Sequence, residues 1–115
     1  MNCDNEREHG ARVAEIKESM LADEKISDLC ARFKVISDPS RLKILLALEG
    51  GELCVDHITE AVGGNQSAVS HQLKILKDNK IIKSRRNGQN VLYSVSDWHV
   101  LTMIGVAKEH LNCNE

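Results

Sequence analysis

Apolar positions in the first third of the chain recur at steps of three and four residues. Between about residues 6 and 37 they are Val13, Ile16, Met20, Ile26, Leu29, Cys30, Phe33 and Ile36. This period predicts amphipathic helix, and a weak break near Ala22 and Asp23 predicts two helices rather than one. Cys30 falls among the apolar positions, so we expect it in the core.

Helix start and stop signals then mark a second helical segment. Asp38 is expected to be its N-cap and Pro39 to lie in its first turn. The apolar run that follows ends at Gly50 and Gly51, where we expect the helix to stop.

Two short helices are predicted next. The first covers about 55–62 and ends at Gly63, which supplies the left-handed residue. Asn65 caps the second, whose inward residues are expected to be Val69, Leu73, Ile75 and Leu76. Two short helices joined by residues 63–65 predict a helix-turn-helix, with the second helix as the recognition helix.

The period changes to two after Asn79. Residues 81–86 and 89–95 alternate like strands and flank Asn87-Gly88, a strong hairpin signal. A hairpin directly after a helix-turn-helix predicts a wing. Ser96-Asp97 then opens a last helix, expected to run to about Leu111.

The expected fold is therefore mainly α with a small β-hairpin, a winged helix-turn-helix. The 115 residues are 42% hydrophobic and 28% charged, which fits one globular domain with a modest core. Within a single domain over 1–115, we expect an N-terminal arm over about 1–10, the helix-turn-helix over about 54–78, the wing over about 81–95 and a C-terminal helix over about 97–112.

Charge is unevenly distributed. The net charge is −2, yet the segment 66–90 is basic and the first thirty residues are acidic. A basic segment in a mildly acidic protein indicates a polyanionic partner, although a solvated charged face has the same composition. No apolar run is long enough to cross a membrane, and nothing resembles a secretory signal. We expect a cytoplasmic protein whose cysteines are not structural disulfides, with no membrane partner.

The predicted recognition helix divides its side chains between core and solvent. Polar side chains of the types that read base edges in the major groove project from its first turns: Gln66, Ser67, Ser70 and His71. Cationic side chains suited to phosphates follow on this helix and on the wing: Lys74, Lys77, Arg85 and Arg86. A solvent-facing polar helix alone would not indicate DNA, but its combination with a basic wing does.

Three segments together resemble the arsenic-repressor (ArsR/SmtB) family of metal-sensing winged-helix repressors. They are residues 33–45 (FKVISDPSRLKIL), 52–55 (ELCV) and 67–74 (SAVSHQLK). The resemblance covers about residues 26–113. It implies a homodimer formed through the first and last helices, binding a palindromic operator in double-stranded DNA.

The last helix carries candidate metal ligands at both of its ends. His99 and His110 are eleven residues apart, so they share a helix face but lie roughly 16 Å apart along the axis. One ion cannot bridge them, because Zn–N bonds are only about 2 Å long. Asp97 with His99, and His110 with Cys113, each form half of a site. An antiparallel partner helix would combine the halves into two four-coordinate sites per dimer.

This ligand set is similar to the family's interface site, with Cys113 in place of its last Glu or His. The implied ion is Zn(II), with Cd(II), Co(II) or Ni(II) as alternatives, and a thiolate favours thiophilic metals. Without a metal, Asp97 would be a helix cap, the two histidines surface residues and Cys113 a residue of a frayed end.

A second set of candidate ligands consists of Cys3, His9, Cys54 and His57. Some family members build a thiolate-rich site from the N-terminal arm and the position matching Cys54. Those members carry Cys-x-Cys there, whereas this chain has Cys54-Val55-Asp56, so one thiolate is missing. A buried Cys54 and a disordered arm are the alternative.

The function expected from these features is a metal-responsive repressor that leaves its operator on binding Zn(II) or a similar divalent ion. A thiol, arsenite or Cd/Pb sensor of the same fold is the alternative, and a metal-buffering protein is another. No nucleophile elbow, phosphate-binding glycine loop or acid–base pair indicates an enzyme, and no small organic substrate is expected.

Overall fold

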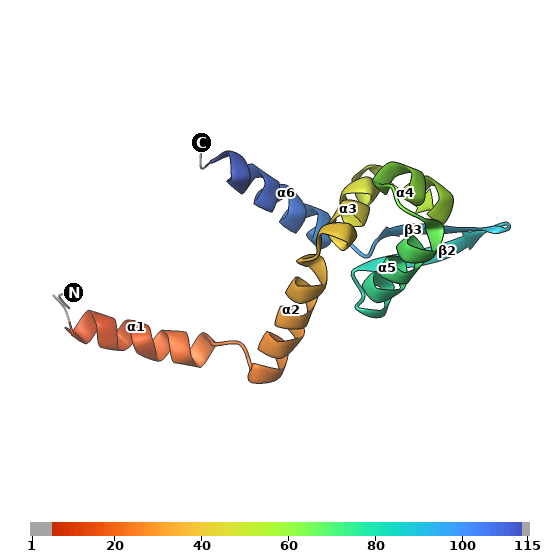
Figure 1. The fold of residues 1–115 in the computed structure, drawn as a ribbon. Coiled ribbons are helices and arrows are strands. Elements are labelled where there is room, and N and C mark those ends of the chain that lie inside the picture. The colour runs from red at the N-terminus through yellow and green to blue at the C-terminus, as the bar shows by residue number, and fades with distance from the viewer. Residues whose placement is uncertain (1–5, 114–115) are drawn as a thin grey trace. The chain divides into compact units, whose positions relative to one another are not determined.

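The computed structural model describes residues 6–113 (Figure 1). The chain consists of two compact units, Met1–Ala31 and Arg32–Glu115. The first unit holds α1 (Glu6–Ser19) and the first two turns of α2 (Asp23–Ile36). The predicted division into two helices is confirmed, since residues 20–22 are not helical. The expected single domain over 1–115 stays a prediction.

The apolar positions of the first unit are exposed. No residue of α2 is buried, and Cys30 is exposed. The expectation that Cys30 lies in the core is therefore wrong for the single chain. Periodic spacing puts apolar residues on one helix face, but it does not say what covers that face.

The second unit contains the remaining elements in the order predicted for a winged helix-turn-helix. They are α3 (Pro39–Ala47), the 3₁₀ turn η1 (Leu48–Gly50), β1 (Leu53–Cys54), α4 (Val55–Val62), α5 (Gln66–Asp78), β2 (Ile82–Asn87), β3 (Asn90–Val95) and α6 (Trp98–Asn112).

Side-chain caps fix where three of these helices begin. Asp38 Oδ2 accepts a hydrogen bond from the Arg41 amide at 3.0 Å, with Pro39 in the first turn of α3. Asn65 Oδ1 accepts from the Ala68 amide at 2.8 Å and so caps α5. Asp97 Oδ1 accepts from the His99 amide at 2.9 Å and caps α6. Each cap satisfies an amide that has no partner within its helix, and each was predicted.

The strands form a three-stranded antiparallel sheet in the order β1-β3-β2. Strand β1 was not predicted, because two residues are too few to show alternation. The hairpin loop is also one residue later than expected. Asn87 pairs with Asn90, and the loop is Gly88-Gln89. Gly88 has φ 66°, so it supplies the positive φ that the first loop position of a type II′ turn needs.

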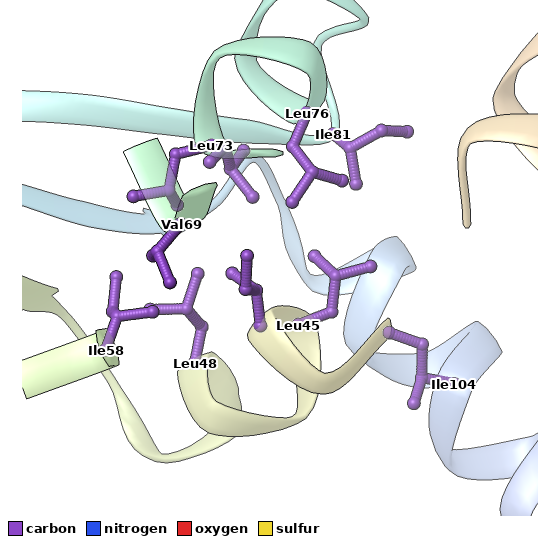
Figure 2. Packing of buried hydrophobic residues seen from close by; sticks show 10 residues of the cluster. Leu45, Leu48, Ile58, Val69, Leu73, Leu76, Ile81 and Ile104 are labelled. Atoms are coloured by element: carbon purple, nitrogen blue, oxygen red, sulfur yellow. The ribbon is translucent and has the colours of Figure 1, made fainter. Parts of the chain in front are cut away.

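One hydrophobic core joins α3, η1, α4, α5, the start of the wing and α6. Figure 2 shows the side chains of α5 pointing toward those of α3, η1 and α4. Val69, Leu73 and Leu76 of α5 are buried as expected. Ile75 was expected with them but is only half-buried, since it lies at the edge of the buried stripe.

Helix α6 is attached to this core along one side. Ile104 is 4% exposed and belongs to the same buried cluster as Leu45 of α3 (Figure 2), and Val100 packs against this cluster. An ion pair of 3.0 Å between Lys108 Nζ and Glu49 Oε1 also joins α6 to η1. Among the described residues, none of the helices is long and apolar enough to cross a membrane.

Candidate DNA-binding surface and metal ligands

The recognition helix α5 presents its polar side chains to solvent. All six predicted DNA-contacting residues of this helix are exposed: Gln66, Ser67, Ser70, His71, Lys74 and Lys77. Burial of Val69, Leu73 and Leu76 on the opposite side fixes which face is presented. Lys74 also forms an exposed ion pair of 2.9 Å with Asp78 one turn later. Such a pair contributes little stability, so Lys74 can exchange Asp78 for another anion at little cost.

Arg41 positions the recognition helix, a role that the sequence reasoning missed. Its Nε donates to the Val35 carbonyl at 2.7 Å, and its Nη1 donates to Gln72 Oε1 at 3.0 Å. Arg41 thus connects the last turn of α2 with the middle of α5. The sequence places Arg41 in the first turn of α3, directly after its N-cap, but no local pattern indicates its partners in α2 and α5.

The wing carries Arg85 and Arg86 on β2, and both are exposed. Arg85 is also paired within the chain. Its Nε and Nη2 donate to Glu52 Oε2 and Oε1 at 2.6 and 2.7 Å, a bidentate contact across 33 residues. The hydrogen bond from Arg85 is the main cause that lowers the pKa of Glu52, and the charges of Arg85 and Lys83 add to it against a desolvation effect. The same contact raises the pKa of Arg85.

One face of α6 carries candidate metal ligands at its two ends and apolar residues between them. His99, Met103, Val106 and His110 follow one another at four, three and four residues, which keeps them on one face. Met103 is 36% exposed and Val106 60% exposed. This face is not the one that packs on the core through Ile104, so the chain's own second unit does not cover it.

Asp97 and His99 lie side by side at the start of α6. Asp97 Oδ1 is 3.3 Å from His99 Nδ1, and both side chains are more than half exposed. Two ligand atoms at bonds of about 2.0–2.1 Å and a tetrahedral angle lie about 3.3 Å apart. The pair therefore fits two positions of a tetrahedral zinc site, and its oxygen and nitrogen donors suit zinc.

His110 and Cys113 lie one turn apart at the other end of α6. The Cys113 amide donates to the carbonyls of Glu109 and His110, at 3.3 and 3.2 Å, so the last turn extends to Cys113. Both side chains are exposed. Residues three apart on a helix are neighbours, and an imidazole and a thiolate are both donors that zinc accepts.

No three His, Cys, Asp or Glu side chains come together as a metal site within residues 6–113 of the single chain. The structure brings the predicted ligands of α6 together only as two pairs.

The second set of candidate ligands is not assembled in the described residues. Cys54 is half-buried and precedes the first turn of α4, where His57 is exposed. His9 is exposed on α1 in the other unit. Cys3 lies outside the described residues.

A capped helix-turn-helix whose recognition helix is followed by an antiparallel hairpin defines the class of winged helix-turn-helix DNA-binding regulators. Residues 38–84 match the family described as "Bacterial regulatory protein, arsR family". A transcriptional repressor SmtB homolog of Synechocystis sp. is 36% identical over 109 residues, covering 95% of this chain and 83% of that protein.

Two further comparisons agree. The transcriptional regulator NmtR of Mycobacterium tuberculosis is 34% identical, over 90% of this chain and 89% of that protein. The homodimeric winged helix-turn-helix DNA-binding domain of a Mycobacterium bovis protein superposes with a TM-score of 0.69 at 29% identity, covering 81% of this chain and 93% of that one. The chain belongs to the arsR family of bacterial regulatory proteins and is a winged helix-turn-helix transcriptional regulator.

Proposed function

We propose that the chain is a cytoplasmic homodimeric repressor that binds palindromic operator DNA and is released when it binds Zn(II) or a similar divalent ion. The observation that carries this proposal is the exposed face of α6. It presents a two-ligand pair at each end, Asp97 with His99 and His110 with Cys113, and no third ligand comes near either pair within the described chain.

A second copy of the chain explains why this face and the N-terminal helices are uncovered. Apart from Leu46 of α3, the exposed large apolar residues of the described chain gather on two parts. On α1, α2 and the link between them they are Val13, Ile16, Met20, Leu21, Ile26, Leu29 and Phe33, and on α6 they are Trp98, Met103, Val106 and Leu111. Exposed apolar surface of this extent is typical of a protein–protein interface. The related domain from M. bovis is homodimeric.

An antiparallel arrangement of the two α6 helices would complete the metal sites. Asp97 and His99 of one copy would then face His110 and Cys113 of the other, at both ends of the helix pair. Met103 and Val106 would pack between the two sites. A bound Zn(II) ion would supply a four-coordinate link at each end.

The α6 helices can pass this link on to the DNA-binding elements. Ile104 packs in the same core as Leu73 and Leu76 of the recognition helix, and Lys108 pairs with Glu49. Holding the two α6 helices of a dimer together would therefore change how its two recognition helices are placed relative to each other. Because coupling between two binding sites is reciprocal, operator DNA should weaken metal binding by the same factor.

DNA recognition is assigned to the exposed residues of α5 and the wing. Base contacts fall to Gln66, Ser67, Ser70 and His71 in the first turns of α5, and phosphate contacts to Lys74, Lys77, Arg85 and Arg86. Their exposure, and the burial of the opposite face of α5, support this division.

Fluorescence anisotropy tests the proposal with a duplex that the metal-free protein selects from a random-sequence pool. The duplex is bound and then titrated with zinc, for the wild type and for His99→Ala/His110→Ala. Zinc should release the wild type, while the variant should stay bound because each of its two sites lacks both of its histidines.

The variant His9→Ala/His57→Ala is a matched control, since it removes two histidines outside α6 and should respond like the wild type. If zinc releases the α6 variant from the duplex but no longer releases the control, metal sensing would be assigned to the set formed by Cys3, His9, Cys54 and His57. A duplex-bound protein that no metal ion releases would contradict the metal response altogether.

A further inference from the structure

Among the described residues, the guanidinium of Arg85 is held by Glu52 on one edge only. Nε and Nη2 point to the two carboxylate oxygens at 2.6 and 2.7 Å. A guanidinium has five N–H donors in a fixed fork, so this contact occupies two of them. The Nη1 edge keeps its two donors, and the side chain of Arg85 is 57% exposed.

Arg85 and Lys83 occupy the same face of the wing. In the register of the sheet Lys83 pairs with Ser94 and Arg85 with Leu92, and residues two apart on a strand project to the same side. A groove on this face is lined by Glu52, Lys83, Ser84, Arg85 and Ser94. It presents two cations, one carboxylate and the Ser94 hydroxyl, a donor-rich lining that suits a phosphate.

Glu52 comes to this groove from outside the wing. It directly precedes β1, which pairs with β3 through Leu53 and Tyr93. Its carboxylate is 36% exposed, so water screens the pair and its direct contribution to stability is small. The bidentate geometry fixes where the guanidinium points, which an exposed lysine at this position could not do.

We propose that Glu52 is a positioning residue for DNA binding: it orients Arg85 toward one phosphate of the operator and cancels its charge toward DNA of any other sequence. This inference rests on the proposed function. Non-specific binding is almost wholly electrostatic, so a neutralised arginine adds little to it. In the operator complex the register is fixed, and the oriented Nη1 edge can donate to a phosphate oxygen. Glu52 thus raises the discrimination between operator and other duplexes rather than the affinity for DNA in general.

Binding to two duplexes at several salt concentrations tests this role. The duplexes are the selected operator and a scrambled sequence of the same length. For Glu52→Gln, which removes the charge and keeps the shape, affinity for the scrambled duplex should rise and the ratio of operator to scrambled affinity should fall. One added phosphate contact steepens the dependence of log K on log salt by about 0.9. Between 50 and 200 mM salt, this steeper slope is an additional loss of affinity of about 3.5-fold.

Two controls separate this role from a general charge effect. Glu49→Gln removes the carboxylate of a side chain that is also 36% exposed but pairs with Lys108, and in the metal-free protein it should leave the slope and the ratio unchanged. The Glu52→Gln change should also have no effect in an Arg85→Gln background, because Glu52 acts through Arg85.

Several results would overturn the proposal. An unchanged slope and ratio for Glu52→Gln, or an equal shift in the Glu49→Gln control, would do so while leaving the proposed function intact. A wild type that binds neither duplex would contradict the proposed function, and this inference with it.

The Arg85 Nε–H signal in NMR spectra tests the Glu52–Arg85 pair without DNA. The Nε–H proton should be protected from exchange in the wild type and lose that protection in Glu52→Gln. Absence of a protected signal from the wild type would also overturn the proposal.

Discussion

Asn65 connects the turn of the helix-turn-helix to the recognition helix through a single hydrogen bond. Its Oδ1 accepts from the Ala68 amide at 2.8 Å, in the first turn of α5. The side chain is exposed, so its contribution to stability comes from this bond rather than from burial.

Asn65→Ala should therefore lower the free energy of unfolding by about 1 kcal/mol, the usual cost of losing an N-cap. Urea unfolding followed by circular dichroism measures the difference. Asn65→Asp is the matched control, because it keeps an oxygen at the same position and should stay close to the wild type. Equal stability of all three proteins would show that the cap does not stabilise α5.

Individual residues were predictable where their role is local and not where it depends on distant partners. The caps Asp38, Asn65 and Asp97 could be read from the sequence, since each bonds to an amide two or three residues away. The partner of Arg85 is 33 residues away and that of Arg41 is 31 residues away. No local pattern encodes such contacts, so neither pair was predicted.

At the scale of elements, the turn between α4 and α5 depends on Gly63. This residue has φ 83° and ψ 175°, a conformation that is almost confined to glycine. An added Cβ would meet no atom within 4 Å. The constraint on this position is therefore the backbone conformation and not the space around it.

Gly63→Ala should destabilise the protein by about 1–3 kcal/mol, the cost of holding an alanine in a sparsely populated backbone region. Differential scanning calorimetry measures the loss. Gly50→Ala is the control: its Cβ also meets nothing within 4 Å and its φ is not positive, so stability should be unchanged or rise by up to about 1 kcal/mol. A loss of the same size in both variants would mean that backbone strain at Gly63 is not the cause.

Helices and the wing were predicted as elements because each is several residues long and has a marked start or end. Strand β1 was missed because Leu53–Cys54 gives no period to detect. The hairpin loop moved by one residue because Asn87 takes part in the ladder opposite Asn90, which places Gly88 rather than Asn87 at the first loop position. Sequence pattern thus locates a hairpin more securely than it locates the residues of its turn.

For the whole molecule, the sequence predicted the ligand pairs of α6, and their assembly into sites stays a prediction. A single chain shows two pairs and no complete set among its described residues. The exposed Cys30 of α2 follows the same logic, since no residue of this helix is buried among the described residues. Periodicity marks a face as apolar, but it does not identify the element that covers that face.

Val106 tests whether the ligand face of α6 is a dimer interface. It is 60% exposed in the single chain and lies between the two ligand pairs. Val106→Glu would place an unpaired charge in the interface. The dimer dissociation constant should therefore rise at least about tenfold, which is a loss of roughly 1.4 kcal/mol of dimerisation free energy. Sedimentation velocity measures it. Ala107→Glu adds the same charge to an exposed position off this face and should remain dimeric. Dimers of equal strength in both variants would place the interface elsewhere.

Complementation between two different mutant chains tests the central claim, that each metal site is built from both copies of the chain. One chain carries Asp97→Ala/His99→Ala and the other His110→Ala/Cys113→Ala. Neither homodimer then has a complete site. In the heterodimer, one site combines only mutated positions, and the other combines the intact Asp97 and His99 of one chain with the intact His110 and Cys113 of its partner.

The measurement is the zinc stoichiometry of the heterodimer, purified through two different affinity tags and titrated by calorimetry. Shared sites predict no tight zinc binding by either mutant homodimer and one zinc ion per heterodimer, against two per wild-type dimer. A heterodimer that binds no more zinc than the mutant homodimers would contradict the claim, because the intact ligand pairs of the two chains would then form no site together.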